Sequence, residues 1–215
     1  MVVSYATLHR QNVEAVKTAS TSRAATKLAD NNVSKLLMAT LAVDKARLQQ
    51  LRSLQARSAL KRDLFPKYAD YLTSLMQQQY TGHNEGFVLL CIWALDAGLL
   101  TQFITLAEYA LKHGMRAPEG FKRALPELLL EEVSERVLKA GNPSDWRDYI
   151  QHLHELIKGS DIADEVTAKS YKALGFALES TDLRASLTAY QIAHQYGAQV
   201  RRAINRLNRV LAHGD

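Results

Sequence analysis

The sequence predicts an all-α fold, in which a long N-terminal helix precedes a bundle of αα-hairpins. Leu, Ala, Gln, Glu, Lys and Arg, which favour helices, are abundant, whereas the 215 residues include only four prolines and ten glycines. No series of alternating apolar and polar residues ends in the Asn-Gly or Asp-Gly turns that mark β-hairpins. The hydrophobic content of 47% is enough to bury a core. We therefore expect only helices.

The chain begins with a polar segment, residues 1–31, rich in Ser, Thr, Ala and Asn. We interpret it as a flexible basic arm. The stretch Ser22 to Leu41 could alternatively form a helix-turn-helix with its turn around Asp30. The segment, however, lacks the glycine that is usual in the turn and the third helix that supports such a motif.

A long helix is predicted next, because Val33 to Leu64 contains neither proline nor glycine. Its leucines repeat at i, i+4, i+11 and i+14, which places them in one narrow stripe. These leucines are Leu37, Leu41, Leu48 and Leu51. Such a helix would be about 45 Å long, more than a chain of this size needs internally. We interpret residues 32–65 as an oligomerisation element in which the stripe packs against another copy of the chain; an ordinary core-facing helix is the alternative.

An internal repeat follows, because Ala94 to Gly114 aligns without a gap with Ala177 to Gly197, at an offset of 83 residues. Six of the 21 positions are identical, and Asp96 aligns with Glu179. Each copy predicts the end of one helix, a short turn and a second helix closed by a C-cap glycine. Such hairpins are tetratricopeptide-like, although two copies are too few for a solenoid. They either form a partner-binding groove or are simply two αα-hairpins in one core.

We expect a central helical domain at residues 66–158 and a C-terminal hairpin with a basic helix at residues 159–215. In the last helix Val200, Ile204, Leu207 and Leu211 share one face. Arg202, Arg206 and Arg209 occupy the opposite face. This basic stripe could contact phosphates, an acidic partner or a neighbouring subunit, or simply serve solubility.

Charge is distributed unevenly along the chain, whose net charge is +5. Residues 1–62 carry +8, residues 63–199 carry −6 and residues 200–215 carry +3. Basic ends predict contact with a polyanion, and an acidic middle predicts contact with protein. The basic residues of the long helix do not share one face. The candidate DNA-binding residues are Lys45, Arg47, Arg52, Arg57, Lys61, Arg62, Arg201, Arg202, Arg206 and Arg209.

No catalytic residue, metal site or cofactor is predicted. The phosphate loop of an ATPase, GxxxxGK[ST], does not occur in the sequence. Two sets of side chains could be considered for a metal-dependent nuclease, Asp145 with Glu155 and Lys158, and Asp161 with Asp164 and Glu165. Their spacing matches no nuclease motif. His152 and His154 are two residues apart on a predicted helix, so their rings diverge. Cys91 lies in an apolar run and is expected to be a core residue.

The longest apolar run, residues 87–95, is about half of what a membrane span needs. The N-terminus carries no apolar segment of the signal-peptide type. A single cysteine excludes an internal disulfide. We therefore expect a cytoplasmic protein without membrane contact.

The middle of the chain resembles the small terminase subunits of temperate contractile-tailed phages that package DNA from cohesive ends. The resemblance covers roughly residues 33–211 and is carried by Leu64-Phe65-Pro66, Trp93-Ala94-Leu95-Asp96-Ala97-Gly98, Ala107 to Met115 with Pro118, and Glu131-Glu132-Val133. It implies a homo-oligomer, commonly a ring, that binds viral double-stranded DNA in the host cytoplasm. It also implies that the chain recruits and regulates the large terminase subunit, which hydrolyses ATP and cuts the DNA.

Two alternatives remain open. The duplicated hairpin also fits a helical-repeat adaptor that binds only protein. Some members of the resembled family are named endonuclease subunits, which leaves an endonuclease that cuts cohesive ends as the other alternative.

Overall fold

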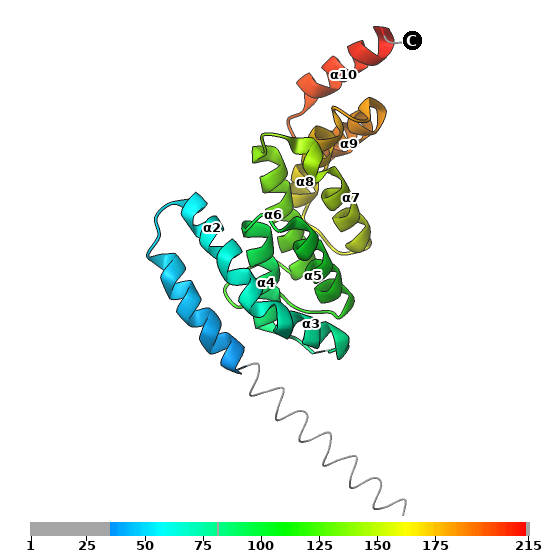
Figure 1. Cartoon of the computed structure of the whole chain (residues 1–215). Helices are drawn as coiled ribbons and strands as arrows, with labels where there is room; N and C mark the ends of the chain where they lie inside the picture. Colours follow the sequence, from blue (N-terminus) through cyan, green and yellow to red (C-terminus); the bar gives the residue numbers. More distant parts are fainter. Residues whose placement is uncertain (1–34, 81, 214–215) are drawn as a thin grey trace, which may run out of the picture. The chain divides into compact units, whose positions relative to one another are not determined.

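The computed structural model describes residues 35–80 and 82–213, and within these ranges it contains helices and no strand (Figure 1). The all-α prediction is confirmed. The predicted arm, residues 1–31, and most of the helix-turn-helix segment lie outside the described residues. The chain divides into two compact units between residues 51 and 52, and each unit is described by itself.

The N-terminal unit contributes one described helix, residues 35–49. The prediction of a single helix from Val33 to Leu64 is wrong, because the helical ladder stops at Gln50. There the N–H of Gln50 bonds the Arg47 carbonyl and that of Leu51 bonds the Leu48 carbonyl, three residues back. Ser53 then takes an extended conformation and accepts a bond from the Ala56 N–H at 3.3 Å, so it caps the next helix.

The C-terminal unit begins with α2 (Leu54–Leu64), the 3-10 helix η1 (Phe65–Tyr68) and α3 (Ala69–Gln77). Pro66 sits in the first turn of η1, where its missing N–H costs no helical bond. Phe65 and Tyr68 are buried. The Tyr68 ring meets Trp93 edge-on, with 6.3 Å between centroids. The Leu64-Phe65-Pro66 motif therefore turns the chain from α2 into the core.

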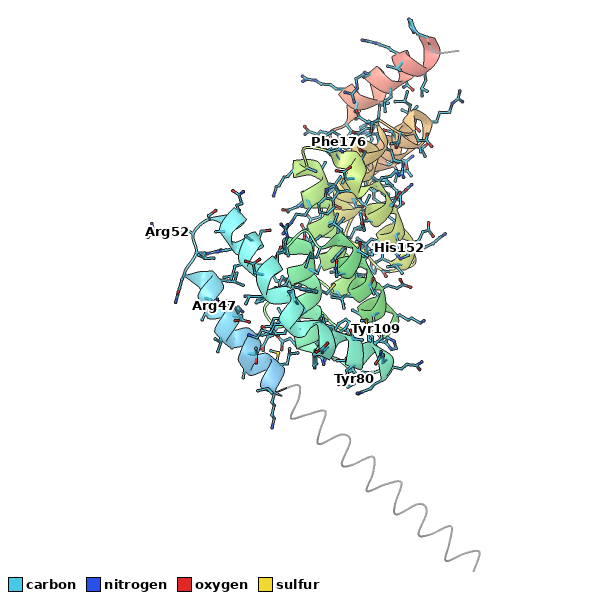
Figure 2. All side chains as sticks on the ribbon, in the orientation of Figure 1. Arg47, Arg52, Tyr80, Tyr109, His152 and Phe176 are labelled. Atoms are coloured by element: carbon cyan, nitrogen blue, oxygen red, sulfur yellow. The ribbon has the colours of Figure 1, made fainter. Side chains whose placement is uncertain are left out.

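The first copy of the repeat is the hairpin of α4 (Glu85–Asp96) and α5 (Leu100–Lys112). Nine residues of α4 are buried, including Cys91, as expected of a helix that is apolar on every side. Tyr109 on α5 donates its hydroxyl toward the carbonyls of Leu75 and Tyr80, at 3.1 Å from each, and thereby ties the end of α3 to the hairpin (Figure 2).

The two hairpins are joined by α6 (Leu125–Lys139), the 3-10 helix η2 (Pro143–Trp146) and α7 (Arg147–Leu156). Glutamates of α6 pair with cations at the seam between α6 and α8 (Asp164–Leu178). Arg123 contacts Glu127 at 2.7 Å and Glu131 at 2.5 Å, and Lys169 contacts Glu131 at 3.1 Å. Much of the negative charge of the middle segment is thus neutralised inside the fold.

The second copy is the hairpin of α8 and α9 (Leu183–Gln195), followed by α10 (Arg201–His213). Both copies end in the same cap. Gly114 and Gly197 have positive φ, and the next residue donates its N–H to the carbonyl five residues back, Met115 to Ala110 and Ala198 to Ala193, at 2.9 Å each. The structure thus has the expected left-handed glycines at both positions, whereas the arrangement as αα-hairpins and its likeness to tetratricopeptide repeats stay a prediction.

The α8–α9 pair is close because Gly175 has no side chain. The Ser186 hydroxyl donates to the Gly175 carbonyl at 2.7 Å, and a Cβ built on Gly175 would lie 2.9 Å from the Tyr190 ring. Tyr190, Ala193, Val200 and Leu207 form a buried cluster that seats α10 on α9.

We predict that Gly175→Ala destabilises the protein by roughly 1–3 kcal/mol, because the added methyl group must displace the buried Tyr190 ring. Urea unfolding followed by circular dichroism measures the change. Gly141→Ala is the matched control, because its Cβ meets nothing within 4 Å. Equal unfolding midpoints for the two variants would contradict the close packing.

Candidate nucleic-acid interface

The structure divides the ten predicted DNA-binding residues among the helix at residues 35–49, α2 with the segment before it, and α10. Lys45 and Arg47 lie on the first helix, where Arg47 contacts Asp44 at 3.3 Å. Arg52 is exposed just before α2 (Figure 2), and Arg57 is half-buried on α2. Two of these four residues thus belong to the N-terminal unit and two to the C-terminal unit.

Lys61 and Arg62 are engaged in holding α2 against the end of α4. Lys61 forms an ion pair with one carboxylate oxygen of Asp96, and its ammonium group lies 5.6 Å from the centre of the Trp93 ring. Arg62 donates from Nε and Nη2 to the Ala97 carbonyl, at 3.0 and 2.6 Å. These cations have partners inside the fold, which leaves less of their charge for phosphates.

Arg206 has a comparable role on α10. Its guanidinium group contacts Glu179 at 2.5 Å, and the same carboxylate accepts the Tyr190 hydroxyl at 2.5 Å. Burial and this hydrogen bond raise the pKa of Tyr190, so its proton stays in place. Glu179 is the repeat equivalent of Asp96. In both copies, the carboxylate at the end of the first hairpin helix therefore binds a cation from a flanking basic helix.

The other cations of α10 are exposed. The helix is amphipathic as predicted, with Leu207 buried against α9 and Arg202 and Arg209 on the solvent side. Among the described residues, no carboxylate pairs with Arg202 or Arg209. Neither arginine is thus neutralised by a carboxylate of residues 35–80 or 82–213, and a polyanion could supply the compensating charge.

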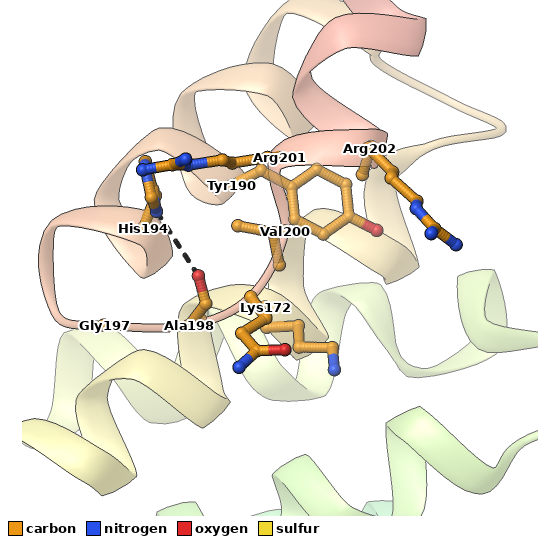
Figure 3. Close-up of a pocket in the computed structure, with 10 residues that line it drawn as sticks. Lys172, Tyr190, His194, Gly197, Ala198, Val200, Arg201 and Arg202 are labelled. Atoms are coloured by element: carbon orange, nitrogen blue, oxygen red, sulfur yellow. Dashed lines mark hydrogen bonds between the residues drawn. The ribbon is translucent and has the colours of Figure 1, made fainter.

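Beside the first turn of α10 lies an open hollow of about 810 Å³ between α8, α9 and the segment that joins α9 to α10 (Figure 3). Four basic residues line it: Lys172, His194, Arg201 and Arg202. His194 faces the Ala198 carbonyl at 3.4 Å, and Arg201 Nε donates to His194 Nε2 at 3.4 Å. We call these residues and their hollow the basic groove.

Sequence reasoning identified Arg201 and Arg202 but missed Lys172 and His194. Lys172 is on α8 and His194 on α9, far from α10 in sequence, and only the hairpin brings them together. The repeat alignment held a signal, because the equivalent of His194 in the first copy is Leu111. A basic residue at that position is thus not required by the hairpin.

The comparisons with known proteins decide the family. A family model for the phage small terminase subunit matches residues 38–165. The chain belongs to this family. A protein of Escherichia phage P2, named "Terminase, endonuclease subunit", is 30% identical over 216 residues, which cover 98% of this chain and 86% of that protein. No solved structure matched the chain.

As a small terminase subunit, the protein is a DNA-binding subunit in phage genome packaging. The family model ends at residue 165, in the first turn of α8. It therefore covers the α4–α5 hairpin and α6, but neither α9, α10 nor the basic groove. The P2 protein, by contrast, aligns over nearly the whole of this small terminase subunit.

Three of the five carboxylates considered for nuclease chemistry have partners within the small terminase subunit. Asp145 accepts a bond from the Asn142 amide at 2.7 Å, Glu155 lies 3.8 Å from Lys158, and Glu165 contacts Arg123 at 2.5 Å. Within residues 35–80 and 82–213, no three His, Cys, Asp or Glu side chains are grouped so as to hold a metal ion. In the same ranges, no helix is both long and apolar enough to span a bilayer.

The two histidines of α7 diverge as predicted. His152 is half-exposed and lies 3.5 Å from Glu108. His154 is mostly buried and stacks on Tyr171, with 4.7 Å between ring centroids. None of the described residues offers a hydrogen-bond partner to His154 Nε2. Burial lowers the pKa of His154 from 6.5 to about 4, and the Ser170 carbonyl opposes this effect only in part.

We predict that His154 makes the protein less stable in mild acid. Between pH 6.5 and about 4 the unfolded chain binds a proton at the His154 imidazole, whereas the folded chain does not. The free energy of unfolding is therefore unaffected by His154 above pH 6.5 and decreases as the pH falls below it. The loss is on the order of 2–3 kcal/mol by pH 4. Urea unfolding of wild type and His154→Phe across this range measures it.

The Phe variant keeps a ring against Tyr171 and should lose this part of the pH dependence. His152→Gln is the matched control and should behave as wild type, because its ring is half-exposed. If wild type and His154→Phe shift in parallel with pH, His154 is not the group responsible.

Proposed function

We propose that this small terminase subunit holds viral DNA through the C-terminal hairpin and α10, and that it is a non-catalytic subunit that recruits and regulates the large terminase subunit. The observation that carries the first part is the pair of exposed arginines on α10, Arg202 and Arg209, for which the described residues provide no carboxylate. Family membership supplies DNA as the polyanion.

The contact we propose is made mainly with the DNA backbone. Guanidinium groups release condensed counterions when they neutralise phosphates, which gives affinity without sequence selectivity. Arg202 and Arg209 are seven residues apart and therefore lie on one side of α10, two turns from each other. The proposal includes further phosphate contacts at Lys45, Arg47, Arg52 and Arg57. The main role of Lys61, Arg62 and Arg206 is to hold helices together.

We propose that copies of the chain associate into a homo-oligomer, as a ring, through the leucines of the helix at residues 35–49. Leu37, Leu41 and Leu48 share one face of this helix and are already buried within the single chain, which fits the core-facing alternative equally well. Leu51 lies beyond the end of the helix, so it no longer extends the stripe. Association multiplies weak phosphate contacts, since each bound subunit raises the effective DNA concentration at the next.

The non-catalytic role is proposed because Asp145, Glu155 and Glu165 have structural partners and the described residues hold no group of three side chains fit for a metal ion. The name of the P2 relative favours the alternative, an endonuclease subunit. In our proposal the terminase cuts DNA through its large subunit, and this chain positions the DNA.

We predict that changing Arg202 and Arg209 together to Gln weakens binding of the full-length protein to a labelled duplex of arbitrary sequence. The loss of two phosphate contacts should lower the slope of log affinity against log salt by about 2. Fluorescence anisotropy between about 50 and 200 mM salt measures both quantities.

The matched control is Lys112→Gln with Arg116→Gln, which removes the same charge from two exposed residues at and after the end of α5. Equal losses in the two variants would mean that net charge, and not α10, governs binding. A wild-type protein that ignores DNA at low salt would favour the protein-only adaptor. Shortened DNA products in the presence of magnesium would favour the endonuclease.

A second prediction concerns self-association. Leu37→Glu with Leu48→Glu should shift the mass found by size-exclusion chromatography with light scattering toward that of one chain, because charge on the leucine face opposes its burial. Both leucines are buried within the single chain, so circular dichroism must show that the variant keeps its helices. Ala39→Glu with Ala46→Glu adds the same charge to the other side of the helix and should leave the mass unchanged. A wild-type protein that is already monomeric at micromolar concentration would contradict the proposal.

A further inference from the structure

We infer that the basic groove seats the sugar-phosphate backbone of a DNA strand and thereby fixes the start of α10 on the duplex. This inference rests on the proposed function and adds a site to it. It assigns a DNA contact to Lys172, which lies on α8 and not on the basic face of α10, whereas His194 on α9 accepts a hydrogen bond from Arg201 at the edge of the groove.

The first argument is charge. Lys172, Arg201 and Arg202 line the groove, and none of them pairs with a carboxylate in the part of the chain that the structure describes. Elsewhere in the same unit, the cations at helix seams do have such partners: Arg123, Arg136 and Lys169 each contact acidic side chains. The groove is thus a local excess of positive charge, and its counter-ion must come from outside the hairpin.

The second argument is the placement of the cations around the hollow. Arg201 and Arg202 leave the first turn of α10 in opposite directions, and Lys172 lies below Val200 (Figure 3). The positive groups therefore surround the hollow and do not converge on one point. Cations spread around a hollow suit a strand with a phosphate at every nucleotide, which can contact several of them in succession.

The third argument is backbone polarity. The first N–H groups of a helix lack intrahelical acceptors and carry partial positive charge. Val200 precedes α10 and has no side-chain oxygen with which to cap them, and it lines the same groove as Arg201 and Arg202. The helix start thus adds to the attraction of the side chains for phosphate.

The fourth argument is continuity. Arg202 belongs both to the groove and to the exposed side of α10 that carries Arg209. A strand seated in the groove is therefore led onto the arginine face of the helix. In the first hairpin Ala107 and Leu111 occupy the positions of Tyr190 and His194, so that hairpin lacks these two polar side chains.

An acidic segment of a protein partner is the competing occupant. Backbone phosphates explain the observations better, because a line of cations that continues from the groove along α10 matches a regularly charged strand. An acidic peptide would need only the groove.

The test separates the groove from the arginine face of α10. Lys172→Gln with Arg201→Gln removes two cations of the groove and leaves Arg202 and Arg209 in place. We expect about a tenfold loss of affinity of the full-length protein for the labelled duplex and a salt slope lower by about 2. The control Lys112→Gln with Arg116→Gln has the same charge loss and should change affinity by no more than about twofold. Circular dichroism verifies that both variants keep their helices.

The outcomes are distinct. If wild type binds DNA and the groove variant behaves as the control does, the groove inference is wrong and the proposed function stands. If wild type does not bind DNA at low salt, the proposed function itself fails. If the groove variant binds DNA normally but no longer co-purifies with the large terminase subunit, the groove holds an acidic protein segment and the inference is likewise overturned.

Discussion

The arrangement of helices in the C-terminal unit depends on one recurring interaction, the carboxylate at the end of the first helix of each hairpin. Asp96 binds Lys61 of α2 and Arg136 of α6, and Glu179 binds Arg206 of α10 together with the Tyr190 hydroxyl. A partly buried carboxylate needs such partners, because unpaired charge is costly away from water. The same pairing uses up part of the positive charge of α2 and α10, so only the remaining cations can interact with DNA.

This division explains why the family resemblance and the DNA interface occupy different parts of the chain. The residues that carry the resemblance, among them Trp93, Asp96, Tyr109 and Gly114, are core, pairing or capping residues. They preserve the scaffold of the phage small terminase subunit. The basic groove and the exposed arginines of α10 lie beyond residue 165, where the family model ends.

Local patterns predicted most of the fold. The hairpins and the amphipathic α10 follow from apolar periodicity and capping glycines, which act within a few residues of each other. The break at residues 50–53 was missed, because Ser53 caps a helix without any proline or glycine to mark the site. The candidate site was predicted less well. Contacts between residues far apart in sequence decide whether Lys61 and Arg206 are paired and whether Lys172 lies near Arg201. The periodicity of apolar residues does not predict such contacts.

The attachment of α10 has a consequence for motion. This helix is held mainly by Leu207 and the neighbouring Val200, which pack against α9, and by the ion pair of Arg206 with Glu179 at the end of α8; Val210 in its last turn is half-exposed. A helix held by so few buried contacts opens locally at a lower free energy than the core, so its amide hydrogens exchange with solvent before those of α4 do. Any ligand that binds only the docked form of α10 would slow that exchange, and DNA recognition would then be coupled to the ordering of the helix.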